Sequence, residues 1–168
     1  GMIDALRKFL PEDGALSTML KGGVALANKD VDTILRLLID AEMKMFHGLD
    51  TPVVFIQNVI TDLLLGLGMN QALKTFHDHV REAYGAEPGY ITMNTPRLLE
   101  VLDRLGIVNP IVCANINKIG FRMCGGIALY ESTIATRKFR PVAMSVLASG
   151  AISPREAIEY VCRQPQIE

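Results

Sequence analysis

The hydrophobic pattern divides the chain into two parts. In residues 30–47 the apolar side chains approximate one helical stripe, and Gly48 stands where a helix would end in a left-handed conformation. Residues 3–10 indicate a short helix, and the pattern of residues 15–20 is ambiguous. We therefore interpret residues 1–50 as a helical N-terminal segment.

In the second part, short apolar runs alternate with amphipathic helices. Asn94 and Ser153 precede two of these helices as N-caps, and each helix has a proline in its first turn. Four strand-then-helix units in succession predict parallel strands joined by right-handed crossovers, and so an α/β fold for residues 51–168. The expected strands are residues 52–58, 89–94, 110–116 and 140–147.

Two closures of such a sheet remain open: an open doubly wound sheet and part of a (β/α) barrel. Polar residues follow the expected strands, and barrels place their active sites at this carboxyl end. A whole barrel takes about 250 residues, whereas this chain has 168. We expect a half TIM-like (β/α) barrel with about four parallel strands, preceded by helices. It would be completed by association or be half of a longer barrel.

Composition narrows the classes of partner. The chain has 17 basic and 18 acidic residues, and this balance argues against nucleic-acid binding. Aromatic residues make up 6% and tryptophan is absent, which argues against a base-stacking platform. Hydrophobic residues make up 49%, and a four-stranded sheet would leave edge strands unpaired. We therefore expect a homodimer or a larger assembly.

The cysteines and the apolar segments indicate a cytoplasmic protein. Cys113, Cys124 and Cys162 show no C-x-x-C spacing, so we expect neither disulfides nor a zinc site, and we interpret Cys124 as buried and inert. Polar residues interrupt the apolar stretch 52–69, which makes it a poor membrane span. We interpret this stretch as a buried strand followed by a loop.

No cofactor is expected from the motifs. The chain has neither a Walker sequence nor G-x-G-x-x-G, which disfavours a nucleotide. His77 and His79 are two residues apart on an expected helix, so they point in different directions and cannot share a metal ion. We interpret both as surface or rim histidines.

Two segments carry a resemblance to a known family. Ile-Val-Cys-Ala-Asn-Ile-Asn-Lys118 and Met-Ser-Val-Leu-Ala-Ser-Gly150, with the strand-loop-helix order of residues 52–164, resemble the later units of aldolase-type (β/α) barrel proteins. In class I aldolases a strand lysine forms a Schiff base with the substrate. The resemblance implies this role for Lys118.

The residues beside Lys118 suggest the rest of a site. A position between barrel walls and close to Arg122 would lower the pKa of Lys118 and favour its neutral, nucleophilic amine. The alternative interpretation of Lys118 is an ordinary exposed loop lysine. Asp62 or Tyr90 would supply the general acid or base. The expected substrate-binding residues orient hydroxyls or hold an anionic group: Asn94, Asn115, Asn117, Arg122, Gly125, Gly126, Ser149 and Gly150. The glycines have a second interpretation as turn residues.

These residues lead to two hypotheses from different classes. The first is a lyase that makes or breaks a carbon–carbon bond in a small, phosphorylated carbonyl compound through a Lys118 Schiff base, without metal or nucleotide. The second is a non-catalytic binder of an apolar or acyl ligand, indicated by the apolar helices and the eight methionines.

Overall fold

The computed structural model describes residues 31–167, so the short helix expected at 3–10 and the ambiguous segment 15–20 lie outside the described residues. The chain divides into two compact units, Gly1–Pro52 and Val53–Glu168. None of the helices within the described range is both long enough and apolar enough to span a membrane.

In the first unit, the structure describes one helix and a single turn that follows it. Helix α3 (Val31–Met43) continues into the 3₁₀ turn η1 (Lys44–Phe46). Gly48 then adopts a φ of 83°, the left-handed conformation that its position after the helix predicts. The helix expected in residues 30–47 is therefore confirmed.

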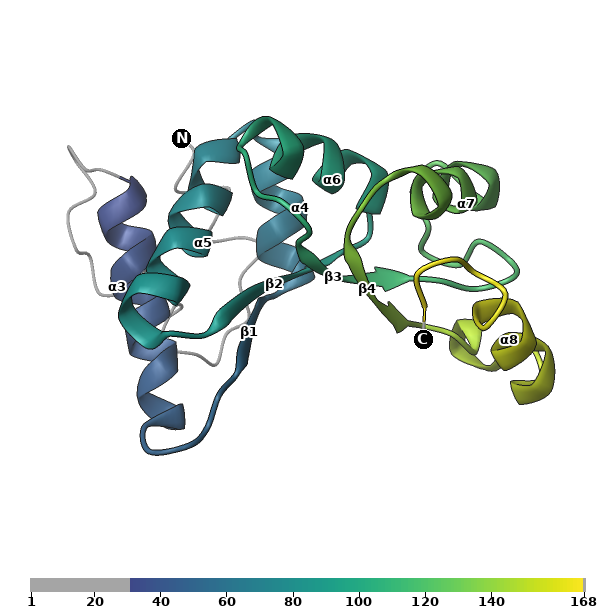
Figure 1. The fold of residues 1–168 in the computed structure, drawn as a ribbon, viewed down its shortest axis with the longest axis horizontal. Helices are drawn as coiled ribbons and strands as arrows, with labels where there is room; N and C mark the ends of the chain where they lie inside the picture. The colour runs from purple at the N-terminus through teal and green to yellow at the C-terminus, as the bar shows by residue number, and fades with distance from the viewer. Residues whose placement is uncertain (1–30, 168) are drawn as a thin grey trace. The chain divides into compact units, whose positions relative to one another are not determined.

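The second unit is an α/β structure built on a four-stranded parallel sheet, as the sequence predicts (Figure 1). Neighbours in the chain are neighbours in the sheet, in the order β1-β2-β3-β4. The strands are β1 (Val53–Ile56), β2 (Glu87–Thr92), β3 (Ile111–Asn115) and β4 (Arg140–Met144). The segments between and after them form α4 (Asn58–Gly66), α5 (Asn70–Tyr84), α6 (Thr95–Arg104), α7 (Ile127–Thr136), η2 (Ala148–Gly150) and α8 (Pro154–Val161).

Helix α4 corrects one expectation. The stretch that follows the first expected strand forms this helix, whereas the sequence predicts a loop there. The polar residues that suggested the loop are accommodated by the helix. Thr61 is fully buried, and its hydroxyl donates a hydrogen bond to the carbonyl of Gln57 at 3.1 Å. Asp62 reaches the end of β2, where its carboxylate accepts two hydrogen bonds. Polar residues with partners can therefore lie within a largely apolar helix.

One face of the sheet forms the core of the second unit. Strand residues alternate between faces, and Tyr90, Val112 and Ala114 lie on one face with no exposed surface. In Figure 1, α4, α5 and α6 lie on the same side of β1 and β2. A sheet whose parallel strands follow chain order requires this arrangement, because each right-handed crossover returns over the same face.

The opposite face contains a close contact between Phe55 and Gly89. These residues are paired across β1 and β2, and a Cβ atom at Gly89 would lie 2.5 Å from two carbons of the Phe55 ring. The ring therefore occupies the space that any larger residue at position 89 would need. Glycine permits this contact because it has no side chain.

We predict that Gly89→Ala lowers the free energy of unfolding by about 1–3 kcal/mol, because the Phe55 ring must move. The loss should shrink when the same change is made in a Phe55→Ala background, as measured by urea unfolding of all four variants. Gly66→Ala serves as the control, since nothing lies within 4 Å of a Cβ at this helical position. An equal loss in both backgrounds would contradict the prediction.

Candidate functional site

The carboxyl ends of β2 and β3 lie side by side at one end of the sheet, which we call its carboxyl edge, and a group of polar contacts joins them there. Met93 is at its centre. Its N–H donates to the Asp62 carboxylate at 3.0 Å. Its carbonyl accepts from the Tyr130 hydroxyl at 2.6 Å and from the Cys124 N–H at 3.1 Å. We call these residues, with Asn115, the carboxyl-edge cluster.

Asn115 is the member of this cluster with unused hydrogen-bonding capacity. It is the last residue of β3 and has no exposed surface. Its amide nitrogen contacts the Met93 sulfur at 3.0 Å, whereas its carboxamide oxygen is buried without a hydrogen-bond partner. A buried acceptor without a donor is unfavourable in a folded chain, so each such group requires an explanation. A ligand that donates a hydrogen bond here would provide one.

Asp62 has a structural role that the sequence did not indicate. It lies inside α4 and not at its N-cap, and its two oxygens accept from the Thr92 hydroxyl and from the Met93 N–H. The Thr92 hydroxyl in turn accepts from the Asn94 N–H at 2.9 Å. Asp62 therefore holds the loop after β2, with both carboxylate oxygens already engaged.

The side chains of Asn94 and Asn117 are also engaged within the chain. Asn94 caps α6 by accepting from the Arg97 N–H at 3.3 Å. Asn117 is fully buried and forms two hydrogen bonds with the backbone of Phe121, accepting at 2.7 Å and donating at 2.9 Å. The expectation that Asn117 orients a substrate hydroxyl is therefore wrong in this structure, because it closes its own loop.

Two of the glycines expected to hold an anion, Gly126 and Gly150, use their amides within turns. The N–H of Gly126 donates to the carbonyl of Met123 at 2.9 Å, and that of Gly150 donates to the carbonyl of Leu147 at 2.8 Å. Both glycines have a φ of 85°. Their amides are therefore not available to a ligand, which corrects the expectation. Gly125, with a φ of 91°, and Ser149, with a φ of 57°, are both exposed.

Lys118 lies at the same edge of the sheet, three residues beyond Asn115, and contacts Glu156 of α8. Its Nζ is 3.1 Å from Oε1 of Glu156, and each side chain is about half exposed, at 52% and 50%. The Ser153 hydroxyl donates to the other Glu156 oxygen at 2.9 Å. The Lys118 ammonium and the Ser153 hydroxyl together lower the pKa of Glu156.

Glu156 was missed as a site residue because its place in the sequence has a simpler explanation. It is three residues after the Ser153 N-cap, the spacing of a capping box. The structure shows that it contacts Ser153 and Lys118 at the same time. Arg122, four residues beyond Lys118, is exposed, and its guanidinium lies over the Phe121 ring at 5.2 Å from the centroid.

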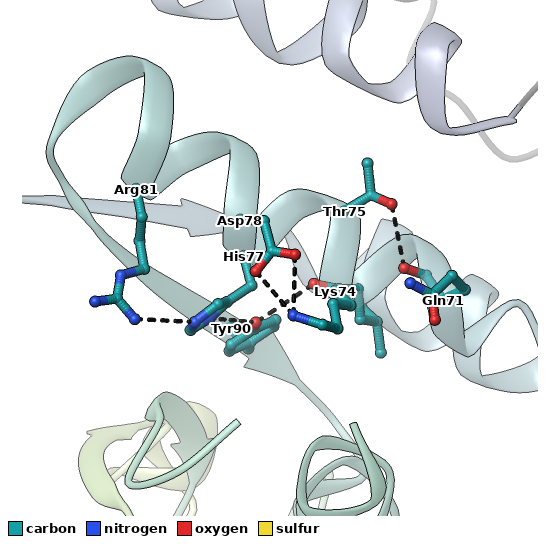
Figure 2. Close-up of polar contacts among 8 residues, drawn as sticks. Gln71, Lys74, Thr75, His77, Asp78, Arg81 and Tyr90 are labelled. Carbon is teal, nitrogen blue, oxygen red and sulfur yellow. Dashed lines mark hydrogen bonds and ion pairs between the residues drawn. The ribbon is translucent and has the colours of Figure 1, made fainter. Parts of the chain in front are cut away.

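Tyr90 points away from this edge, toward α5 (Figure 2). It is fully buried, its ring contacts Phe76 edge-on at 5.6 Å, and its hydroxyl lies 3.3 Å from Nδ1 of His77. Burial raises the pKa of Tyr90 far above its usual value. The expectation that Tyr90 is a reachable acid or base is corrected, because the strand alternation places it on the helix-covered face.

One of the two histidines of α5, His79, differs from the interpretation as a surface or rim residue. His79 is buried with 9% exposure, and His77 is half-buried between Tyr90 and Arg81. Burial and the Arg81 charge lower the pKa of His77, and Lys74 adds to this, although Asp78 opposes it. Figure 2 shows this group, in which Lys74 and Asp78 form an ion pair at 2.9 Å.

The cysteine prediction was also wrong in one respect. Cys124 is exposed, because the turn before α7 carries it to the surface. Cys113 is half-buried, and burial raises the pKa of its thiol. Among residues 31–167, no three His, Cys, Asp or Glu side chains are grouped so that they could hold a metal ion.

We predict that His77 makes the stability of the chain depend on pH. Because its pKa in the fold lies below the unfolded value of about 6.5, the unfolded chain binds more protons just below pH 6.5. The free energy of unfolding should therefore fall as the pH drops from about 7 through this range. His77→Asn should flatten this part of the profile in thermal unfolding, whereas His47→Asn, at an exposed position, is the control. Identical slopes for wild type and His77→Asn would refute the assignment.

Comparisons of this chain with known proteins give no match. No protein-family model matches the chain, and searches of curated proteins and of solved structures also find no match.

Proposed function

We propose that this chain is a lyase of the aldolase type, acting on a small carbonyl compound at the carboxyl edge of a half TIM-like (β/α) barrel. The observation that carries the proposal is the contact between Lys118 and Glu156, 3.1 Å apart, beside the strand that ends in Asn115. An amine that forms an imine needs a group to take its proton. Glu156 is that group, in place of Asp62 and Tyr90.

Glu156 suits this role because of its partners. Its lowered pKa keeps it as a carboxylate near neutral pH, and Ser153 holds one of its oxygens while Lys118 contacts the other. The ion pair favours the Lys118 ammonium at rest, so the neutral amine that attacks a carbonyl forms transiently, when the carboxylate takes one proton from Lys118. Because both side chains are about half exposed, a substrate can reach Lys118 from solvent.

The proposed reaction balances without a cofactor. The Lys118 nitrogen attacks the carbonyl carbon, and loss of water gives a protonated imine. The bond between Cα and Cβ of the imine breaks as the Cβ hydroxyl gives its proton to the Glu156 carboxylate; the electron pair of that bond moves toward the imine nitrogen, and an enamine and an aldehyde result. Protonation of the enamine carbon and hydrolysis of the imine then regenerate the lysine.

Two neighbouring residues indicate the kind of substrate. The buried Asn115 oxygen is an acceptor without a donor, which suits a substrate hydroxyl. Arg122 is exposed four residues from Lys118, and its guanidinium suits a phosphate or carboxylate. We therefore favour a hydroxylated carbonyl compound with an anionic group, such as dihydroxyacetone phosphate.

The apolar-ligand hypothesis has one supporting feature. A cavity of about 130 Å³ lies between the end of α6 and the start of β3, lined by Leu99, Leu102, Ile107 and Pro110, with Asp103 and Arg137 at its side. Apolar cavities of about 150 Å³ hold a benzene-sized molecule. This cavity is thus too small for an acyl chain, and the geometry favours the lyase.

We predict that borohydride traps dihydroxyacetone phosphate, pyruvate or a simple aldehyde covalently on Lys118, as located by peptide mass mapping. Lys118→Met should abolish the adduct, and Glu156→Gln should slow its formation by about 10²-fold, because the proton acceptor is lost. Lys138→Met is the matched control, an exposed lysine that lies beside the cavity near the start of β3. An adduct that survives Lys118→Met, or no adduct with any of the three compounds, would refute the lyase proposal.

A further inference from the structure

The face of the sheet opposite α4, α5 and α6 carries mostly apolar side chains. Strand alternation and the pairing register place Phe55, Gly89, Ile91, Ile111, Cys113, Val142 and Met144 on this face, together with Asn115, whose side chain is buried. Phe55 is 36% exposed and Val142 is 44% exposed. On the covered face, Tyr90 and Val112 have no exposed surface. A parallel sheet is ordinarily covered on both faces, and α4, α5 and α6 of the second unit lie on the other one.

Within the part of the chain that the structure describes, both edge strands also have a free side, because β1 and β4 each pair with one neighbour only. On β4, the Arg140 N–H donates to the carbonyl of Pro110, and the Met144 carbonyl accepts from Ile116. The backbone N–H and C=O groups of successive residues point to opposite sides of a strand. The C=O of Pro141 and the N–H and C=O of Ala143 therefore point away from β3. Such groups are a template for another strand.

The charges on the open face restrict the kind of partner. By register, Glu87 and Arg140 lie on this face, and they form an ion pair across β3. They neutralise each other, and the net charge of the chain is only −1. A polyanion or an anionic membrane would find no excess positive charge here, while a second copy of the chain would meet no repulsion.

We propose that two copies of this chain join through these edges, β4 of each pairing with β1 of the other, to close an eight-stranded parallel barrel. A twofold axis along the barrel brings β4 of one copy and β1 of the other together in the parallel sense and leaves α4, α5 and α6 outside. Eight strands enclose an interior that side chains just fill, and Phe55, Ile91, Val142 and Met144 are apolar side chains of suitable size. Stacking the two open faces would instead leave all four edges unpaired.

Light scattering and native mass spectrometry of the full 168-residue chain test this assembly. At 10–50 micromolar we expect a dimer. Val142→Lys should give monomers, because a lysine would enter the barrel interior, whereas Ile158→Lys, at a 57% exposed position on α8, should remain dimeric. A wild-type monomer at these concentrations, or a dimer unaffected by Val142→Lys, would overturn the proposal.

Hydrogen exchange at Ala143 distinguishes edge pairing from stacked faces without changing the sequence. Its N–H points to the free edge, so in the barrel it donates to β1 of the other copy and exchanges slowly. We expect this protection to disappear in the Val142→Lys monomer. Ala143→Pro, which removes the N–H and leaves the pairing with β3 in place, should also give a folded monomer by circular dichroism. A wild-type dimer whose Ala143 exchanges as fast as in the monomer would overturn the barrel arrangement.

Discussion

The parallel sense of the four strands is the constraint on which the rest of the second unit depends. A parallel neighbour cannot be reached by a tight turn, so each connection must cross the sheet, and the right-handed preference sends each one over the same face. The sheet consequently has a helix-covered face and an open face. The same constraint collects every carboxyl end on one edge, which is why Asn115 and the loop after β2 meet.

This constraint also explains which parts of the fold the sequence predicted well. The apolar runs and the caps at Asn94 and Ser153 are local signals, and four strands and most helices follow from them. Helix α4 was missed because its polar residues looked like interruptions. These polar residues have hydrogen-bond partners in the Gln57 carbonyl and in the loop after β2. One partner, Met93, is 31 positions from Asp62 in the sequence. Local pattern carries no information about such a partner.

The candidate site was less predictable, for a related physical reason. Asn117 was selected because it follows a strand and Tyr90 because of its residue type. A loop contact with Phe121 and the alternation of strand β2 decide where these two side chains point. Glu156 illustrates the opposite error. Its capping-box position explained it completely within the sequence, although it is 38 residues from Lys118 and contacts it in the fold. Whether two side chains from different loops meet is decided by tertiary packing.

The backbone hydrogen bonds of Met93 connect strand-helix units that are separate in the sequence. Strand-helix units in chain order look like repeats that could be added or removed one at a time. The N–H of Met93 is bound by Asp62 from the unit before it, however, and its carbonyl by Cys124 and Tyr130 from the unit after it. Cutting the chain between any of these units would leave a peptide group without its partner. The three strand-helix units therefore form one cooperative structure, in which the loop after β2 is hydrogen-bonded to the turn that precedes α7.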